Sequence, residues 1–275
     1  MGEALHPGGD VGDSEDHGSE LRVTWPCRRC EREFRCDRCC FSVLREVVEG
    51  IPTSDPRHPD LLLWHEGDIE IFYTPFDWMN VSAKVMLVGI TPGLYQATKA
   101  LECAKACLAA QMSDNETLRQ VDATGSFAGP MRRNLVTMLD GIGLPEALGL
   151  TTTERLFDSG HDLVDHASAI SYPVFVGGGN YAGSNPPLLG QPILRSSAKA
   201  WLGASVNMAE GALVIPLGTV ATEAVEMLVA EGLLDRGRGL LGVPHPSGAN
   251  GWRARQYAER RQRLQQAVAT WANGS

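Results

Sequence analysis

Residues 84–93, Lys84-Val85-Met86-Leu87-Val88-Gly89-Ile90-Thr91-Pro92-Gly93, decide the fold class of this 275-residue chain. Residues 84–88 form a short, largely apolar run that is typical of a buried strand. Residues 89–93 supply the glycines and the proline of a tight turn. The Ala- and Leu-rich segment 94–112 then predicts a helix. A buried strand that turns directly into a helix indicates an α/β fold.

The same alternation of strands and helices continues along the chain. The predicted elements are a helix over 41–49, a helix over 130–140, a strand over 167–176, a strand over 213–217 with a helix to 231, a strand over 240–243 and a closing helix over 252–272. This pattern predicts a parallel sheet with helices on both faces. We divide the chain into a flexible acidic tail (1–24), a small Cys-rich segment with a linker (25–67) and one α/β domain (68–275).

The net charge of −9 argues against a generic nucleic-acid-binding protein, whose surface is usually basic. However, residues 1–20 hold six acids and no Lys or Arg, so the rest of the chain is nearly balanced. Arginines cluster over 28–38 and again over 253–263. No apolar run approaches the roughly 20 residues of a membrane span, and no signal peptide is recognisable. We expect a cytoplasmic monomer without a membrane segment.

Two loop motifs follow predicted strands and are candidates for a functional site. Gly89-Ile90-Thr91-Pro92-Gly93 follows the first strand, and His245-Pro246-Ser247-Gly248-Ala249-Asn250 follows the last. In open parallel sheets, ligands bind beyond the carboxyl ends of the strands, where loops and helix N-termini point backbone N–H groups outward. Each motif alone is also compatible with an ordinary turn, but their combination, order and separation are much more specific.

With the segments 126–135 and 141–144 between them, these motifs resemble the uracil-DNA glycosylase superfamily. The central region is closest to its iron–sulfur-type branch, whereas the first motif diverges. The resemblance covers about residues 84–265. It implies a three-layer α-β-α sandwich around a four-stranded parallel sheet. It also implies an enzyme that extrudes a DNA base and hydrolyses its N-glycosidic bond, leaving an abasic site.

The resemblance assigns roles to individual residues. His245 matches the histidine that donates to the carbonyl oxygen of the departing base. Phe127 matches the ring that stacks on the base, although a core aromatic is the alternative interpretation. The other expected base-binding residues of the first motif are Gly89, Ile90, Pro92 and Gly93. The expected DNA-contacting residues are Ser247, Gly248, Asn250 and Arg253.

The residue that would activate water departs from the family pattern. Thr91 stands where the family commonly has Asp or Asn, and a hydroxyl without a nearby base abstracts a proton poorly. We therefore expect Thr91 only to orient water. Asp122 and Asp77 are substitute carboxylates, although an ordinary loop or cap role is the alternative for each. Electrostatic help for the leaving base can suffice, because a transition state with oxocarbenium character needs little nucleophilic assistance.

Tyr172 is the second departure, since it aligns with an Asn that reads the uracil edge. The glycine-rich stretch 177–183 that follows has little side-chain bulk. We therefore predict that the substrate base is uracil or a bulky modified pyrimidine, such as a hypermodified base of phage DNA, in repair or antiviral defence. A DNA-binding protein that keeps the fold without turnover is the alternative. A nucleotide-binding enzyme is disfavoured, because no phosphate-binding glycine fingerprint follows a strand.

A group of paired cysteines predicts a metal site near the N-terminus. Two Cys-x2-Cys pairs could close a tetrahedral thiolate site, and the residues are Cys27, Cys30, Cys36 and Cys39. Zinc is one candidate. An iron–sulfur cluster is another, in which Cys103 and Cys107, four residues apart on a predicted helix, could join Cys27 and Cys30 as ligands. The favoured alternative for Cys103 and Cys107 is that they are two small buried residues. Free thiols are the third possibility, and the glycosidic chemistry needs no cofactor.

Overall fold

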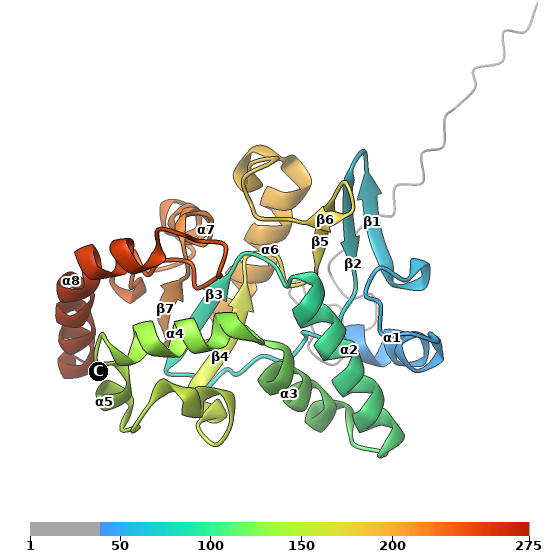
Figure 1. The fold of residues 1–275 in the computed structure, drawn as a ribbon, viewed down its shortest axis with the longest axis horizontal. Helices are drawn as coiled ribbons and strands as arrows, with labels where there is room; N and C mark the ends of the chain where they lie inside the picture. The colour runs from blue at the N-terminus through green and yellow to red at the C-terminus, as the bar shows by residue number, and fades with distance from the viewer. Residues whose placement is uncertain (1–38, 275) are drawn as a thin grey trace, which may run out of the picture.

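The computed structural model describes residues 39–274 and has a mixed α/β architecture with a parallel sheet in the middle (Figure 1). In this sheet β3 (Val85–Gly89) lies between β4 (Val164–Ser168) and β7 (Leu213–Pro216), and both pair with it in parallel. All five residues of β3 are buried, as its apolar sequence predicts. The α/β class is confirmed.

The parallel sheet contains three strands rather than the expected four. Residues 239–243 run beside β7 and join it through only two bridges, Val214–Gly239 and Leu217–Val243. Along β7 the backbone N–H groups of residues 213 and 217 donate to carbonyl oxygens at the ends of the β3 segment. Because successive residues of a strand direct their N–H groups to opposite sides, an N–H group at residue 216 would point toward residues 239–243. That residue is Pro216, which has no N–H group to donate. The missing donor interrupts the ladder and explains why 240–243 is no regular strand.

Side chains of β3 alternate between two hydrophobic cores, one on each face of the sheet. Met86 and Val88 belong to the larger core, whereas Val85 and Leu87 belong to the smaller one. The helices that contribute buried residues to the larger core are α1 (Cys39–Gly50), α2 (Leu94–Ala109), α3 (Asp114–Gly125), α6 (Pro192–Met208) and α7 (Thr219–Ala230). Those of the smaller core are α4 (Pro130–Asp140), α5 (Leu144–Leu148) and α8 (Arg253–Gly274). Helices therefore cover both faces.

A second, antiparallel sheet lies beside the first and was not predicted. Its strands, in spatial order, are β1 (Leu62–Glu66), β2 (Ile69–Phe72), β5 (Val174–Val176) and β6 (Gly179–Asn180). The single strand predicted over 167–176 is wrong, because the chain leaves the parallel sheet after Ser168 and enters the other sheet at Val174. Gly177 and Gly178 form the β5–β6 turn with φ angles of +56° and +75°, which glycine adopts easily.

Short 3-10 helices complete the described chain. They are η1 (Pro59–Leu61), η2 (Thr153–Phe157), η3 (His161–Leu163), η4 (Leu188–Gly190) and η5 (Arg236–Arg238). Phe41 and Val48 of α1 are fully buried, so this helix, which lies within the predicted Cys-rich segment and linker (25–67), packs against the α/β body. Between residues 39 and 274, no helix combines the length and apolar character that a bilayer span requires.

Candidate functional site

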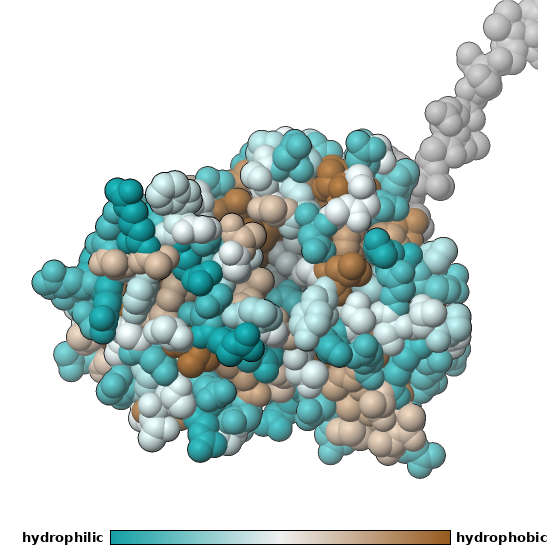
Figure 2. Space-filling model, in the orientation of Figure 1, coloured by the Kyte–Doolittle hydropathy of each residue, from teal (hydrophilic) through white to brown (hydrophobic). Residues whose placement is uncertain are grey.

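A pocket of about 810 Å³ opens at the carboxyl end of the parallel sheet. The residues that end or follow β3, β4 and β7 all line it, as expected for a ligand site in an open parallel sheet. The predicted residues brought together here are Gly89, Ile90, Thr91, Pro92, Gly93, Phe127, His245, Ser247, Gly248 and Asn250. In Figure 2 the middle of this face is hollowed, and apolar side chains border the hollow.

His245 lies in this pocket as a hydrogen-bond donor of defined geometry. Its Nδ1 atom accepts a hydrogen bond of 3.3 Å from the backbone N–H of Ser247, which places the proton of the neutral ring on Nε2. Burial lowers the pKa of His245 below its usual value. The ring is therefore neutral near pH 7, and its Nε2–H group can donate to a ligand in the pocket.

Three side chains brace the loop that carries His245. They donate to consecutive backbone carbonyls: Asn250 to His245 (3.2 Å), Asn134 to Pro246 (2.9 Å) and Arg253 to Ser247 (2.7 Å). Arg253, expected to contact DNA, thus supports the loop instead of lining the pocket. Asn134 comes from α4, more than 100 residues earlier in the chain. Sequence reasoning missed it, because its partner is a backbone atom that no motif identifies.

Phe127 reaches the pocket through an unusual backbone conformation. Its φ angle is +52°, a region that non-glycine residues rarely occupy, and its ring is mostly buried. The ring packs close to the backbone of Gly89, where an added Cβ atom would lie 3.4 Å from Phe127 Cε1 and 3.3 Å from Ser168 Oγ. Gly89 therefore provides the space that lets the ring of Phe127 approach the end of β3.

The hydroxyl of Thr91 ties the turn after β3 to the neighbouring chain. It donates to the carbonyl oxygen of Tyr172 (2.7 Å) and accepts from the N–H of Val174 (3.2 Å). The Thr91 proton is thus already committed, although the residue lines the pocket. Its position favours a structural role in holding the turn.

Tyr172 and Asp77 lie behind the pocket, in the core. The phenol of Tyr172 donates to Asp77 Oδ1 (2.7 Å), and the phenol of Tyr73 donates to Asp77 Oδ2 (2.6 Å). Both side chains are buried, and neither residue lines the pocket. Assigning Tyr172 to the base edge is therefore not supported, since the chain has already left β4. Ser168, the last residue of β4, does line the pocket, and sequence reasoning missed it.

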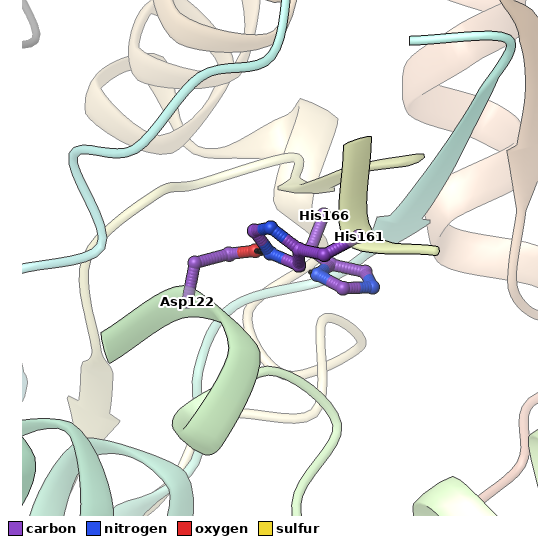
Figure 3. Close-up of side chains that lie close together, drawn as sticks. All are labelled: Asp122, His161 and His166. Atoms are coloured by element: carbon purple, nitrogen blue, oxygen red, sulfur yellow. Dashed lines mark hydrogen bonds and ion pairs between the residues drawn. The ribbon is translucent and has the colours of Figure 1, made fainter. Parts of the chain in front are cut away.

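Asp122 is the centre of a buried polar cluster (Figure 3). Its Oδ2 atom lies 2.7 Å from both His161 Nε2 and His166 Nδ1, and its Oδ1 atom accepts from Ser126 Oγ at 2.8 Å. Burial alone raises the pKa of Asp122, but the interactions with His166 and His161 outweigh it and hold that pKa well below its usual value. One ligand atom from each of these three residues lies within 4.8 Å of the others, so the group could hold a metal ion.

The cluster also decides what Asp122 can do at the pocket. Asp122 is only 2% exposed and does not line the pocket, whereas His166 does. Among the described residues that line the pocket there is no Asp or Glu. Asp122 therefore cannot take a proton from a water molecule bound there without a rearrangement.

The predicted metal ligands lie at the edge of the structure. Cys27, Cys30 and Cys36 fall outside the described residues, as does the side chain of Cys39. Cys103 and Cys107 lie on α2 with their Sγ atoms 4.0 Å apart. Burial is the main reason why the pKa of Cys107 is raised to about 11, so this thiol stays protonated near neutral pH.

Comparison with known proteins identifies a relative along nearly the whole chain. No protein-family model and no solved structure matches it. The chain is 35% identical over 243 residues to the uncharacterized protein YoxB of Bacillus subtilis (strain 168), a match that covers 86% of this chain and 94% of YoxB. An identity of this level over this length places the two proteins together: the chain belongs to the YoxB family.

Proposed function

We propose that this protein is a DNA glycosylase that hydrolyses the N-glycosidic bond of an extruded base. One observation carries the proposal. A single pocket at the carboxyl edge of a parallel sheet collects the turn at 89–93, the ring of Phe127 and the imidazole of His245 from three distant parts of the chain. These are the groups that the sequence resemblance assigns to the turn beside the base, the stacking ring and the donor.

The size and lining of the pocket are compatible with an extruded nucleotide. A base that has left the duplex is bound by stacking and by hydrogen bonds to its edge. Phe127 offers a ring, and the half-buried His245 offers an N–H donor. The volume of about 810 Å³ lies within the usual range for small-molecule sites, about 300–1,000 Å³. It leaves room for the sugar as well as the base.

His245 would act on the leaving group. As the bond between C1′ and the base nitrogen breaks, its electron pair moves into the base, and the Nε2–H group donates to the base carbonyl oxygen that gains charge. The oxygen of a water molecule then bonds to C1′ and loses a proton to solvent or to the base. The products are a free base and an abasic sugar in an intact strand.

Water activation would contribute little in this enzyme. The pocket lining described above has no carboxylate, and the Thr91 proton is bonded to the carbonyl oxygen of Tyr172. A transition state with oxocarbenium character needs only a weak nucleophile, because most of the barrier lies in the departure of the base. We therefore assign the rate acceleration mainly to His245 and limit Thr91 to shaping the turn.

The substrate base would be uracil or a modified pyrimidine, including the hypermodified pyrimidines of phage DNA. Two of the sequence arguments for a bulky base no longer support it. Tyr172, expected at the base edge, is in the core, and Gly177 and Gly178, expected to leave space beside the base, form a hairpin turn. The pocket volume is the remaining argument for a larger base. The choice between uracil repair and antiviral defence depends on which base is released.

A DNA-binding protein without turnover is the second candidate function. The absence of a carboxylate among the described lining residues favours it, as does the engaged hydroxyl of Thr91. The two candidates differ in their products. A binding protein protects DNA without forming abasic sites, whereas a glycosylase forms them.

A metal bound by the four N-terminal cysteines would be structural under this proposal. Their paired spacing fits zinc, and an iron–sulfur cluster is the alternative. No step of the chemistry above needs this metal.

The test of the proposed function is a panel of DNAs that contain uracil, hypoxanthine, hydroxymethylcytosine or glucosylated hydroxymethylcytosine, each in single- and double-stranded form. We expect alkali-labile sites at one or more of these bases with the wild-type protein and a loss of about 100–1,000-fold with His245→Ala. Binding without alkali-labile sites on any substrate would instead support the non-catalytic candidate.

A further inference from the structure

The backbone at Phe127 has to be held in place. A bulky residue with φ = +52° stores strain, and such a conformation persists only when its surroundings fix it. The preceding residue is fixed at several points. Ser126 N–H donates to the Asp122 carbonyl oxygen (3.0 Å), Ser126 Oγ donates to the Asp122 carboxylate (2.8 Å), and Arg132 Nη2 donates to the Ser126 carbonyl oxygen (2.6 Å).

The ring of Phe127 is also supported from behind. His166 meets it edge to face, with ring centroids 5.9 Å apart and planes at 73°. Two further rings contact His166: Phe157 stacks on it at 4.8 Å with planes 7° apart, and His161 lies tilted against it at 5.6 Å. Arg132 lies over the Phe157 ring at 4.4 Å. The bond from His166 Nδ1 to Asp122 Oδ2 fixes the remaining rotation of the imidazole. Asp122 thus acts on both the backbone and the ring support of Phe127.

The distances in the cluster are those of hydrogen bonds. Both histidine nitrogens lie 2.7 Å from the same carboxylate oxygen. Ligand atoms around a tetrahedral zinc ion, each about 2.0–2.1 Å from the metal, would lie about 3.3 Å apart. Because Oδ1 also accepts from Ser126, both carboxylate oxygens are satisfied by donors of the protein. The geometry favours a hydrogen-bonded cluster over a metal centre.

We propose that Asp122 is a positioning residue which, through Ser126 and His166, holds Phe127 in the conformation that places its ring in the pocket. What the ring then does for a base rests on the proposed function; the conformational claim does not. Asp122 itself touches no substrate in this account. By positioning the ring of Phe127, the cluster would contribute to substrate specificity, because a correctly placed ring favours ligands with a planar face that can stack on it.

The conformational claim is tested by crystal structures of the wild-type protein and Asp122→Asn. The asparagine keeps the size of the side chain but puts an NH2 group against one of its donors. We expect φ of Phe127 to move to a negative value and the ring to leave the pocket wall. Asp68→Asn, a change at an exposed aspartate in the β1–β2 turn, should leave Phe127 unchanged. Phe127 in its wild-type conformation in Asp122→Asn would overturn the proposal, whatever the enzyme activity.

A double-mutant cycle tests the functional part. We expect Asp122→Asn to slow single-turnover base release about tenfold or more, but to have little further effect in a Phe127→Ala background. An equal loss in both backgrounds would indicate a merely structural role and overturn the proposal. Ser126→Ala, which removes one bond of the cluster, gives a milder second variant if Asp122→Asn does not fold, and the same cycle applies.

Metal analysis provides an independent check on the wild-type chain. We expect its metal content to be unaffected by Asp122→Asn. One equivalent of zinc or iron that is lost in Asp122→Asn and retained in a Cys27→Ser/Cys30→Ser variant would show a metal centre at the cluster and overturn the hydrogen-bonded account.

Discussion

A Cβ atom added to Gly218 would lie 2.7 Å from the Cβ atom of His245. Gly218 also has φ = +86° and ψ = 178°, a region open essentially to glycine alone. Its N–H group donates to the carbonyl oxygen of Val243 (2.8 Å), which joins the end of β7 to the chain that leads into the His245 loop. This glycine therefore sets how closely the histidine packs against the sheet.

Gly218→Ala is expected to destabilise the protein by about 1–3 kcal/mol through backbone strain and to displace His245. Base release should fall more than stability alone explains, because the donor moves relative to the base. Gly211→Ala is the matched control, since an added Cβ there meets nothing within 4 Å and its φ is not in the positive region. Urea unfolding and single-turnover rates measure the two effects. Wild-type stability and rate in Gly218→Ala would show that the close approach is dispensable.

His245 should give the folded protein a measurable pH dependence. Burial lowers the pKa of His245 in the folded state, whereas in the unfolded chain it is near 6.5. Below about pH 6.5 the unfolded state binds the proton first, so stability falls as the pH decreases towards the folded-state pKa. Above about pH 7.5 His245 is unprotonated in both states, and its contribution to the unfolding free energy no longer changes with pH.

The measurement is the unfolding free energy of the wild-type protein and of His245→Gln between pH 5 and 8. We expect the wild-type protein to lose stability relative to the variant as the pH falls below about 6.5. Parallel curves for the two proteins would mean that His245 titrates alike in both states, contrary to its burial.

Asn134→Ala should weaken the support of the His245 loop. It removes the hydrogen bond of 2.9 Å to the Pro246 carbonyl oxygen, worth about 1 kcal/mol. We expect base release to slow by about tenfold or less, with the helix α4 intact. Asn115→Ala, at an exposed position of α3, controls for the substitution itself. Equal rates for the two variants would remove Asn134 from the positioning of the loop.

The N-terminal cysteines lead to a prediction about metal content. We expect about one zinc ion per chain, lost when Cys27 and Cys30 are replaced by serine. Brown protein containing iron would identify the cluster alternative instead. Metal-free protein of unchanged stability would contradict both.

The parts of the fold that could be predicted from sequence are those with a local cause. The apolar run 84–88 marks β3, and Pro130 with Gly141 bounds α4 at its observed residues. The antiparallel sheet was missed because its strands are short, of two to five residues, and pair only through tertiary contacts. The single strand predicted over 167–176 failed for the same reason. The chain leaves one sheet after Ser168 and enters the other at Val174, and the hydrophobic pattern of the sequence does not mark this change of sheet.

In the candidate site, too, the residues with a local sequence signal could be predicted and those brought together only by the fold could not. The motifs at Gly89 and His245 could be recognised because their chemistry is local to a loop. The cluster of Asp122, His161 and His166 could not, since its members come from three elements and are unremarkable one by one. The local signal was weak: His166 directly precedes the predicted strand over 167–176, and a polar side chain that becomes buried in a sheet needs a polar partner elsewhere in the chain.

The central claim is that the pocket releases a base from DNA through His245. It is tested most directly by single-turnover reactions on the uracil, hydroxymethylcytosine and glucosylated substrates, with mass spectrometry of the small-molecule products. We predict a free base and an equal amount of abasic site in an unbroken strand, formed at least about 100-fold faster by the wild-type protein than by His245→Ala. Base release at the same rate by His245→Ala, or DNA bound with no free base from any substrate, would contradict the account.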